Sequence, residues 1–278
     1  WETLADNLVR YSESHPDPDR SVTVYCTARA YPEKAYSYHG ATLRYSRLNA
    51  NGVQSIPYDA ITMFDAAFRR HDRLLLLGVS GAVALPLLRL FTRAKITNVD
   101  GIEWRRNKWS NLAKRFLKWS EALAVRYSHT VIADNAGIAE YLKQTYGIDA
   151  RVIAYGGDQA LEGGGGEHAL TVDLPDRFTL ALCRIEPENN VEMILEAFSE
   201  ASMPLVFVGN WNNSEFGREL KARFAEQPNL HLLDPIYDPA ELFALRSKAV
   251  AYVHGHSVGG TNPSLVEMMH FGIPVLAF

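Results

Sequence analysis

Apolar strand-like runs and amphipathic helical stretches alternate along almost the whole of this 278-residue chain. Short apolar runs at 73–78, 178–183 and 249–253 are separated by stretches of helical periodicity such as 112–128 and 190–200. Strands connected through helices pair in parallel, and a parallel sheet is covered on both of its faces. The alternation therefore predicts an α/β protein built from βαβ units. By the same periodicity, residues 82–92 are expected to form a helix.

One segment interrupts this alternation. Residues 158–168 are poor in apolar side chains and contain four consecutive glycines, at 163–166. A glycine run has no side chains to pack and does not favour regular structure. The alternation restarts at Leu174. We therefore expect two facing Rossmann-like domains, at 1–160 and 170–278, with a ligand cleft between them.

Composition narrows the class of protein. The net charge of −4 provides no overall attraction to nucleic acid, so no nucleic-acid partner is expected. The two cysteines lie in apolar runs, which is typical of a reducing compartment, and we expect a cytoplasmic protein. No run of about 18 apolar residues is present to span a membrane. The sequence starts inside a helical pattern and stops inside a strand-like run, so we expect it to be truncated at both ends.

The segment between the strand at 249–253 and the next helix has the features of an anion site. Pro263 suits the first turn of that helix and Asn262 suits its N-cap, while glycines at 259–260 would let the backbone approach a ligand closely. Free backbone N–H groups at a helix start favour an anion such as a pyrophosphate. Glu267 lies one turn further on. The alternative is a glycine-rich turn followed by a capped helix.

Residues 259–275 also resemble a known motif. They are similar to the donor-binding segment of retaining family 4 glycosyltransferases, which have the GT-B fold. Glu267 matches the second glutamate of that motif, which the resemblance implies bonds the donor ribose. Gly272 and Pro274 match its tail. The position of the first family glutamate is occupied by Gly259.

A second motif lies at 183–190, where the family has an arginine, a glutamate and a lysine. Arg184 matches the arginine and Glu188 the glutamate, but Asn189 replaces the lysine. The resemblance implies that Arg184 holds the donor phosphates. Its position after a strand, where open α/β sheets bind ligands, points the same way. The alternative is a surface ion pair between Arg184 and Glu186 or Glu188.

Taken together, the two segments resemble a bacterial subgroup of rhamnosyltransferases that build surface polysaccharide repeat units. The resemblance implies a glycosyltransferase that moves a sugar, rhamnose among the candidates, from a nucleotide-sugar donor to a glycan or lipid-linked acceptor. His256 then contacts the sugar or diphosphate, or is a turn histidine with satisfied hydrogen bonds. For His254 the structural alternative is favoured.

The N-terminal half contains a third segment of the same resemblance, at 100–109, directly after a predicted strand. The carboxylates of Asp100 and Glu103 are candidates for binding the acceptor or orienting its hydroxyl. Their alternative role is to pair with the neighbouring Arg105 and Arg106.

From Trp104 to Trp119 the chain has six cationic residues and no acidic one. Within this segment Trp109, Leu112, Phe116 and Trp119 recur at helical spacing. A basic helix with aromatic residues can lie on an anionic membrane surface, so peripheral contact with the inner face of the membrane is one expectation. The alternative is that the apolar stripe packs on the sheet while the cations are solvated.

The candidate residues fall into three groups. The candidate catalytic residues are Arg184, Glu267, His256, Asp100 and Glu103. The candidate donor-binding residues are Asn189, Gly259, Gly260, Thr261, Asn262 and Ser264. The resemblance adds Gly209 and Asn210, which it implies flank the donor, and Ile236, which it implies contacts the donor base. The candidate acceptor or membrane residues are Arg105, Arg106, Lys108 and Trp109.

No metal and no cofactor is expected, since the nucleotide-diphosphate sugar is a substrate. The N-terminal domain is expected to bind the acceptor and the C-terminal domain the donor. Two alternatives stay open: a nucleotide-sugar epimerase of the same fold, and a non-catalytic protein that binds sugar nucleotides.

Overall fold

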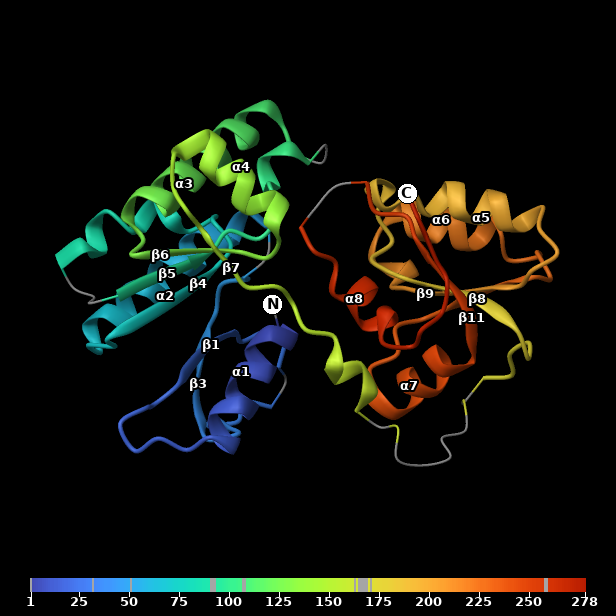
Figure 1. Ribbon diagram of the computed structural model, residues 1–278, viewed down its shortest axis with the longest axis horizontal. Coiled ribbons are helices and arrows are strands. Elements are labelled where there is room, and N and C mark those ends of the chain that lie inside the picture. The colour runs from blue at the N-terminus through green and yellow to red at the C-terminus, as the bar shows by residue number, and fades with distance from the viewer. Residues whose placement is uncertain are drawn as a thin grey trace. The chain divides into compact units, whose positions relative to one another are not determined.

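The computed structural model describes residues 2–31, 33–50, 52–90, 94–106, 109–162, 164, 170, 172–257 and 260–278. The chain forms two compact units, Trp1–Ala154 and Tyr155–Phe278 (Figure 1). Each unit contains a parallel sheet packed with helices, so the predicted α/β class with Rossmann-like units is confirmed.

The first unit is organised around a sheet of four parallel strands in the order β4-β5-β6-β7. Its strands are β4 (Arg73–Leu77), β5 (Ala94–Asn98), β6 (Thr130–Ala133) and β7 (Arg151–Val152). Its helices are α1 (Glu2–Ser14), α2 (Ser55–Phe68), α3 (Asn111–Tyr127) and α4 (Ala136–Tyr146). Side chains of α2, α3 and α4 form one buried cluster with the sheet, which includes Met63, Ala124 and Leu142.

A smaller sheet in this unit has the order β1-β3-β2, and the sequence pattern did not predict it as a separate sheet. Its strands are β1 (Thr23–Thr27), β2 (Ser37–Tyr38) and β3 (Ala41–Ser46). It is held to α2 by polar contacts with Asp65. The Tyr25 hydroxyl donates to this carboxylate at 2.7 Å, and the Arg44 guanidinium pairs with it at 2.9 Å.

The helix expected at 82–92 was a wrong prediction. Two short 3-10 helices are found instead, η2 (Ala82–Ala84) and η3 (Leu87–Leu90). Pro86 stands between them. Proline has no N–H to donate within a helix, and its ring clashes with the carbonyl group four residues earlier, so the α-helical pattern is broken at this point.

The second unit contains five parallel strands in the order β10-β9-β8-β11-β12. They are β8 (Phe178–Leu182), β9 (Leu205–Val208), β10 (Leu230–Leu233), β11 (Ala249–His254) and β12 (Val275–Ala277). The chain runs outward from β8 to β10 and then returns to the other side of β8 with β11. The strand order therefore reverses between β8 and β11, and open α/β sheets bind ligands at such a switch point.

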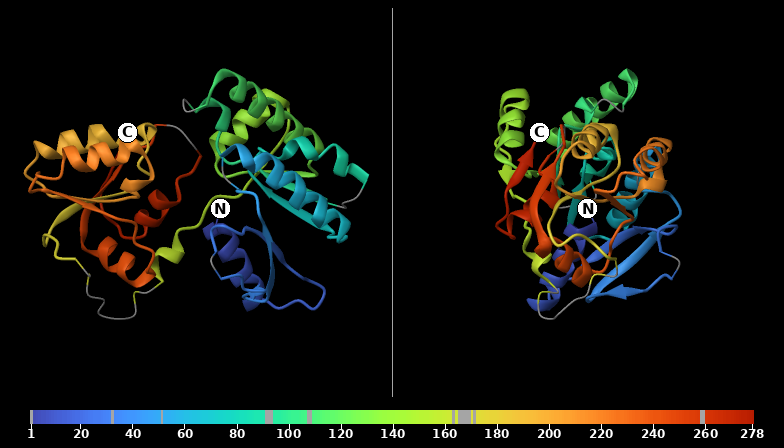
Figure 2. Two further views of the ribbon diagram at one scale, coloured as in Figure 1. Left: turned by 180° about the vertical axis from the view of Figure 1, so that it is seen from behind. Right: turned by 90° about the vertical axis from the view of Figure 1, so that its right-hand side faces the viewer.

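The helices of this unit cover both faces of its sheet, as Figures 1 and 2 show. They are α5 (Val191–Ser199), α6 (Glu215–Arg223), α7 (Pro239–Lys248) and α8 (Pro263–Met269). One buried cluster joins α5 and α6 to the sheet, and a second joins α7 and α8 to it. The short helix η5 (Asp158–Leu161) packs against α7 and α8 and so belongs to the second unit.

None of the helices in the described part of the chain is both long enough and apolar enough to cross a membrane.

Candidate functional site

At the switch point of the second unit, two loops follow adjacent strands. Arg184 lies just after β8, and His254 is the last residue of β11. The Asn190 side-chain amide donates to the carbonyl oxygen of Gly255 at 2.8 Å. The backbone N–H of Ser257 donates to the Glu188 carbonyl at 3.1 Å, and the Ser257 hydroxyl donates to it at 2.8 Å. The two loops are thus bonded into one surface.

Asn189 is part of this framework. Its side chain is buried, with the residue only 1% exposed, and its amide donates to the Arg184 carbonyl at 2.7 Å. The loop of β11 passes so close that a Cβ at Gly255 would lie 2.4 Å from the Asn189 carbonyl oxygen. Asn189 therefore shapes the backbone from which the Arg184 side chain projects.

The Arg184 guanidinium lies at the surface. Its side chain is 64% exposed, and Nη1 is 3.6 Å from the Glu186 carboxylate. The structure thus contains the ion pair that was the alternative interpretation of this arginine. An exposed pair of this kind contributes little to stability. The guanidinium is consequently able to turn from Glu186 towards a bound anion.

Two imidazoles stack beside this loop. The rings of His254 and His256 lie 4.4 Å apart between centroids and are inclined by only 11°. Burial lowers the pKa of His254, which favours its neutral form at pH 7. Within the described residues, Nδ1 of His254 has no hydrogen-bond partner. Nε2 of His256 accepts from the Asn262 side-chain amide at 2.6 Å.

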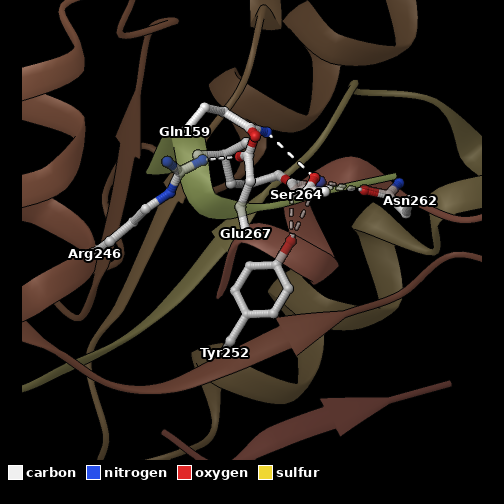
Figure 3. A network of polar contacts seen from close by, with 8 residues as sticks. Gln159, Arg246, Tyr252, Asn262, Ser264 and Glu267 are labelled. Atoms are coloured by element: carbon white, nitrogen blue, oxygen red, sulfur yellow. Dashed lines mark hydrogen bonds and ion pairs between the residues drawn. The ribbon is translucent and has the colours of Figure 1, made fainter. Parts of the chain in front are cut away.

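The start of α8 is fixed by side chains from the sequence motif. The Asn262 carboxamide oxygen accepts the Ser264 backbone N–H at 3.0 Å, which is an N-cap hydrogen bond. The Ser264 hydroxyl lies 2.6 Å from the same oxygen and 3.2 Å from the Leu182 carbonyl oxygen. Tyr252 donates to this carbonyl at 3.2 Å (Figure 3). Asn262 and Ser264 thereby join β8, β11 and α8.

Glu267 lies in a buried ion pair that the sequence did not predict. Its carboxylate accepts from the Arg246 guanidinium of α7 and from the Gln159 amide, the latter at 3.0 Å (Figure 3). The side chains of Arg246 and Glu267 are 5% and 14% exposed. Burial lowers the pKa of Arg246, and the Glu267 carboxylate opposes this effect. The carboxylate is therefore neutralised and oriented by its neighbours.

The remaining donor-binding candidates lie at the ends of neighbouring strands. Gly209 follows β9, and a Cβ there would lie 2.4 Å from the Ile185 side chain, so the position leaves room for glycine only. Asn210 is exposed, and Ile236 packs partly buried against the cluster beneath α7 and α8. Two candidates, Gly260 and Thr261, are half-buried before α8. Gly259 lies outside the described residues.

The corresponding edge of the first unit is acidic. Asp100 follows β5 with a left-handed φ of 59°, and its N–H donates to the Asn98 side chain at 3.1 Å. Burial, reinforced by the nearby carboxylates of Asp134 and Glu103, raises the pKa of Asp100 to about 6. Asp134 follows β6 and is fully buried. Sequence analysis missed Asp134, although its place directly after a parallel strand was a usable signal.

Glu103 is held within its own loop. Its carboxylate pairs with Arg106 at 3.1 Å and accepts from the Trp109 indole N–H at 3.0 Å. This is the pairing expected in the alternative interpretation. Arg105 lies over two aromatic rings, 5.3 Å from the centroid of Trp104 and 5.4 Å from that of Tyr141.

Of the four acceptor or membrane candidates, Lys108 lies outside the described residues. The other three, Arg105, Arg106 and Trp109, lie close to Glu103 and Asp100.

Two residues of the predicted stripe, Leu112 and Trp119 on α3, do not pack on the sheet, so for them that alternative was wrong. Leu112 is 78% exposed and Trp119 is 54% exposed. The buried residues of this helix are instead Leu117, Ser120, Glu121 and Ala124. Glu121 accepts from the hydroxyls of Tyr141 and Tyr146 at 2.6 and 2.7 Å.

Among the described residues, no group of three or more His, Cys, Asp or Glu side chains is arranged to hold a metal ion. The functional groups at the edge of the second unit are a surface arginine and two imidazoles. Those at the edge of the first unit are carboxylates.

Solved structures share this architecture over nearly the whole chain. Sucrose-phosphate synthase from Thermosynechococcus elongatus matches with a TM-score of 0.72 at 14% identity, covering 100% of this chain and 75% of that one. UDP-GlcNAc 2-epimerase from Neisseria meningitidis bound to UDP-GlcNAc matches at 0.67 and 14%, covering 99% and 79%. HepE from Anabaena in complex with UDP and glucose matches at 0.64 and 16%, covering 98% and 76%.

These likenesses show the GT-B fold of two Rossmann-like units. A search of curated proteins finds no match. A family model described as "Domain of unknown function (DUF1972)" matches residues 1–158, more than half of the chain. The chain therefore belongs to the DUF1972 family.

Proposed function

We propose that this protein is a glycosyltransferase that uses a nucleotide-diphosphate sugar as its donor. The observation that carries the proposal is the switch point of the second unit. There the exposed Arg184 guanidinium and the stacked rings of His254 and His256 lie on two loops that are hydrogen-bonded to each other. An arginine and imidazole groups at the carboxyl ends of parallel strands suit a diphosphate.

In the proposed mechanism, negative charge develops on the diphosphate as the bond to the transferred sugar breaks. Arg184 stabilises that charge, and His256 contacts the sugar or the diphosphate. Glu267 accepts from the ribose with lone pairs that Arg246 and Gln159 leave available. By resemblance to family 4 enzymes, transfer retains the anomeric configuration.

The acceptor is proposed to bind at the acidic edge of the first unit. A carboxyl group with a pKa near 6, as at Asp100, can accept a hydrogen bond from a sugar hydroxyl and exchange its proton near neutral pH. Glu103 is held beside it by Arg106 and Trp109. The finer proposals are a rhamnosyl donor, a glycan or lipid-linked acceptor in surface polysaccharide synthesis, and a location at the inner face of the membrane.

Proteins of the same fold support a nucleotide-sugar ligand. HepE is seen with UDP and glucose, and the Neisseria epimerase with UDP-GlcNAc. The fold likeness covers both units.

The test is thermal stabilisation by dTDP, UDP and GDP, because a ligand that binds only the native state raises its stability. At least one nucleotide should raise Tm, and Arg184→Ala should abolish most of that shift. The matched control is Arg177→Ala, since Arg177 is exposed at the opposite end of β8 and should leave the shift unchanged. Equal loss in both variants, or no shift in the wild type, would contradict the proposal.

A nucleotide-sugar epimerase is the second candidate, favoured by the match to UDP-GlcNAc 2-epimerase. The two reactions differ in their products. Incubation with a labelled nucleotide sugar and no acceptor should return the donor unchanged, or slowly hydrolysed, if the protein is a transferase. An epimeric nucleotide sugar would identify an epimerase, and binding without turnover of any acceptor would indicate a non-catalytic binding protein.

A further inference from the structure

The outward face of α3 carries exposed apolar side chains beside a cation. Leu112, Arg115 and Trp119 are spaced by three and four residues and therefore share one side of the helix. All three side chains are exposed. Phe116 packs edge-on against Trp119, with ring centroids 6.1 Å apart. The face thus combines large apolar groups with a cation.

The charge of this helix is one-sided. Its exposed cations are Arg115, Lys118 and Arg126, and Lys114 is half-buried. The acidic residue of α3, Glu121, is fully buried and bonded by Tyr141 and Tyr146. Within α3, which the structure describes completely, every charge that solvent can reach is therefore positive.

From this arrangement we infer that the outward face of α3 docks on a bilayer with anionic headgroups. Trp119 and Leu112 would enter the headgroup region, while the arginines and lysines meet lipid phosphates. The apolar part consists of few side chains, which is small for a stable protein interface. A membrane does not need a large shape-matched patch, because each basic residue near an anionic surface adds to binding.

The inference deepens the proposed function and, for the acceptor, rests on it. Lys118 lies 4.7 Å from the centroid of the Trp104 ring, and Glu103 to Arg105 form a short helix packed against α3. Docking through α3 would bring the bonded side chains of Glu103, Arg106 and Trp109 to the level of the headgroups. The acceptor selected there is a lipid-linked glycan.

Helix α2 offers an internal comparison. Ile61 and Phe68 are spaced by seven residues, as are Leu112 and Trp119, and are 55% and 76% exposed. Between them lies Asp65, which pairs with Arg69 at 2.9 Å, so this face lacks the unopposed positive charge of α3. The pair Ile61→Ser/Phe68→Ser is therefore a matched control for Leu112→Ser/Trp119→Ser.

The experiment is flotation of the whole chain with vesicles of phosphatidylcholine alone or mixed in equal parts with phosphatidylglycerol. The wild type should float with the mixed vesicles, and high salt should release it. Leu112→Ser/Trp119→Ser should lower vesicle binding roughly tenfold, and Arg115→Gln about fivefold. The α2 pair should bind as the wild type does.

Three outcomes would overturn the inference: no flotation of the wild type, equal binding to both vesicle types, or equal loss in the α2 and α3 pairs. Vesicle binding requires no donor, and Leu112 and Trp119 lie outside the second unit. The Tm shift with UDP should therefore be the same in Leu112→Ser/Trp119→Ser and in the wild type. A protein that floats but is stabilised by no nucleotide would refute the proposed function and leave the docking surface standing.

Discussion

The two units present opposite chemistry at equivalent places, the carboxyl ends of their parallel strands. In the first unit, Asp100 and Asp134 follow adjacent strands, and burial together with the neighbouring carboxylates raises the pKa of Asp100. In the second, the loops after β8 and β11 carry Arg184 and His256, while the carboxylate of Glu267 is paired with Arg246.

This difference shows that the same edge of two Rossmann-like units can carry opposite charge. The first edge gathers carboxyl groups, which we propose to contact the hydroxyl groups of the acceptor. At the second edge the protein neutralises its buried carboxylate and exposes a guanidinium, which suits an anion. Substitutions at either edge can test this contrast.

The largest loss of stability is expected when the buried ion pair of the second edge, Arg246 with Glu267, is broken. Glu267→Ala would leave the Arg246 guanidinium buried without its partner, which costs about 3–5 kcal/mol of unfolding free energy. Denaturant unfolding of the second unit measures this loss. Glu219→Ala on the exposed side of α6 is the control and should change little. A loss below about 1 kcal/mol for Glu267→Ala would mean that the pair is not desolvated.

A lysine should not be accommodated at position 189 of the second edge. Asn189→Lys would put an ammonium group into a site that is 1% exposed and would remove the hydrogen bond to the Arg184 carbonyl. Loss of the hydrogen bond alone costs about 1–3 kcal/mol, so Asn189→Lys should destabilise more than Asn189→Ala. Thermal unfolding of both variants decides this. If the lysine variant is stable and binds UDP more tightly, the side chain at 189 reaches the ligand after all.

A smaller effect is expected at the first edge, where Asp100 should make the unfolding free energy depend on pH. The folded state raises the pKa of Asp100 from 3.8 to about 6, so the folded protein binds more protons than the unfolded chain between these values. Its contribution to stability therefore falls as pH rises from about 4 to about 6 and stays low above that. Asp100→Asn should flatten this slope and raise stability at neutral pH.

The measurement is the unfolding free energy across that pH range. Asp59 has a pKa raised to about 6 by burial as well, so Asp100→Asn should leave part of the slope and Asp59→Asn/Asp100→Asn should remove more of it. If Asp100→Asn keeps the wild-type slope of unfolding free energy against pH, solvent screens the charge of Asp100 and its pKa is not raised.

Much of the fold followed from local pattern. Predicted strands at 73–78, 178–183 and 249–253 correspond to β4, β8 and β11, because apolar runs between helical stretches have few other solutions. The helix predicted at 82–92 was wrong, because Pro86 interrupts the helical hydrogen bonding that the periodicity favoured.

The candidate site was predictable in part. Position after a strand singled out Asp100 and Arg184, and the same rule applied to Asp134 would have found it. Arg246 had no comparable signal, because a basic residue in the last turn of a helix is ordinary for the helix dipole. Its partner Glu267 is distant in sequence and meets it only through the packing of α7 and α8 on the same face of the sheet.

By itself, the sequence determined the class of fold and the loops that carry its polar residues, because periodicity and motif spacing are local properties. Only the tertiary structure decided which charges are cancelled and which are exposed. It buried Asn189 and paired Glu267, and it turned Trp119 and Leu112 of α3 outwards. The reason is physical: the free energy of a charge or an apolar surface depends on its neighbours and on solvent, and these are set by contacts between distant segments.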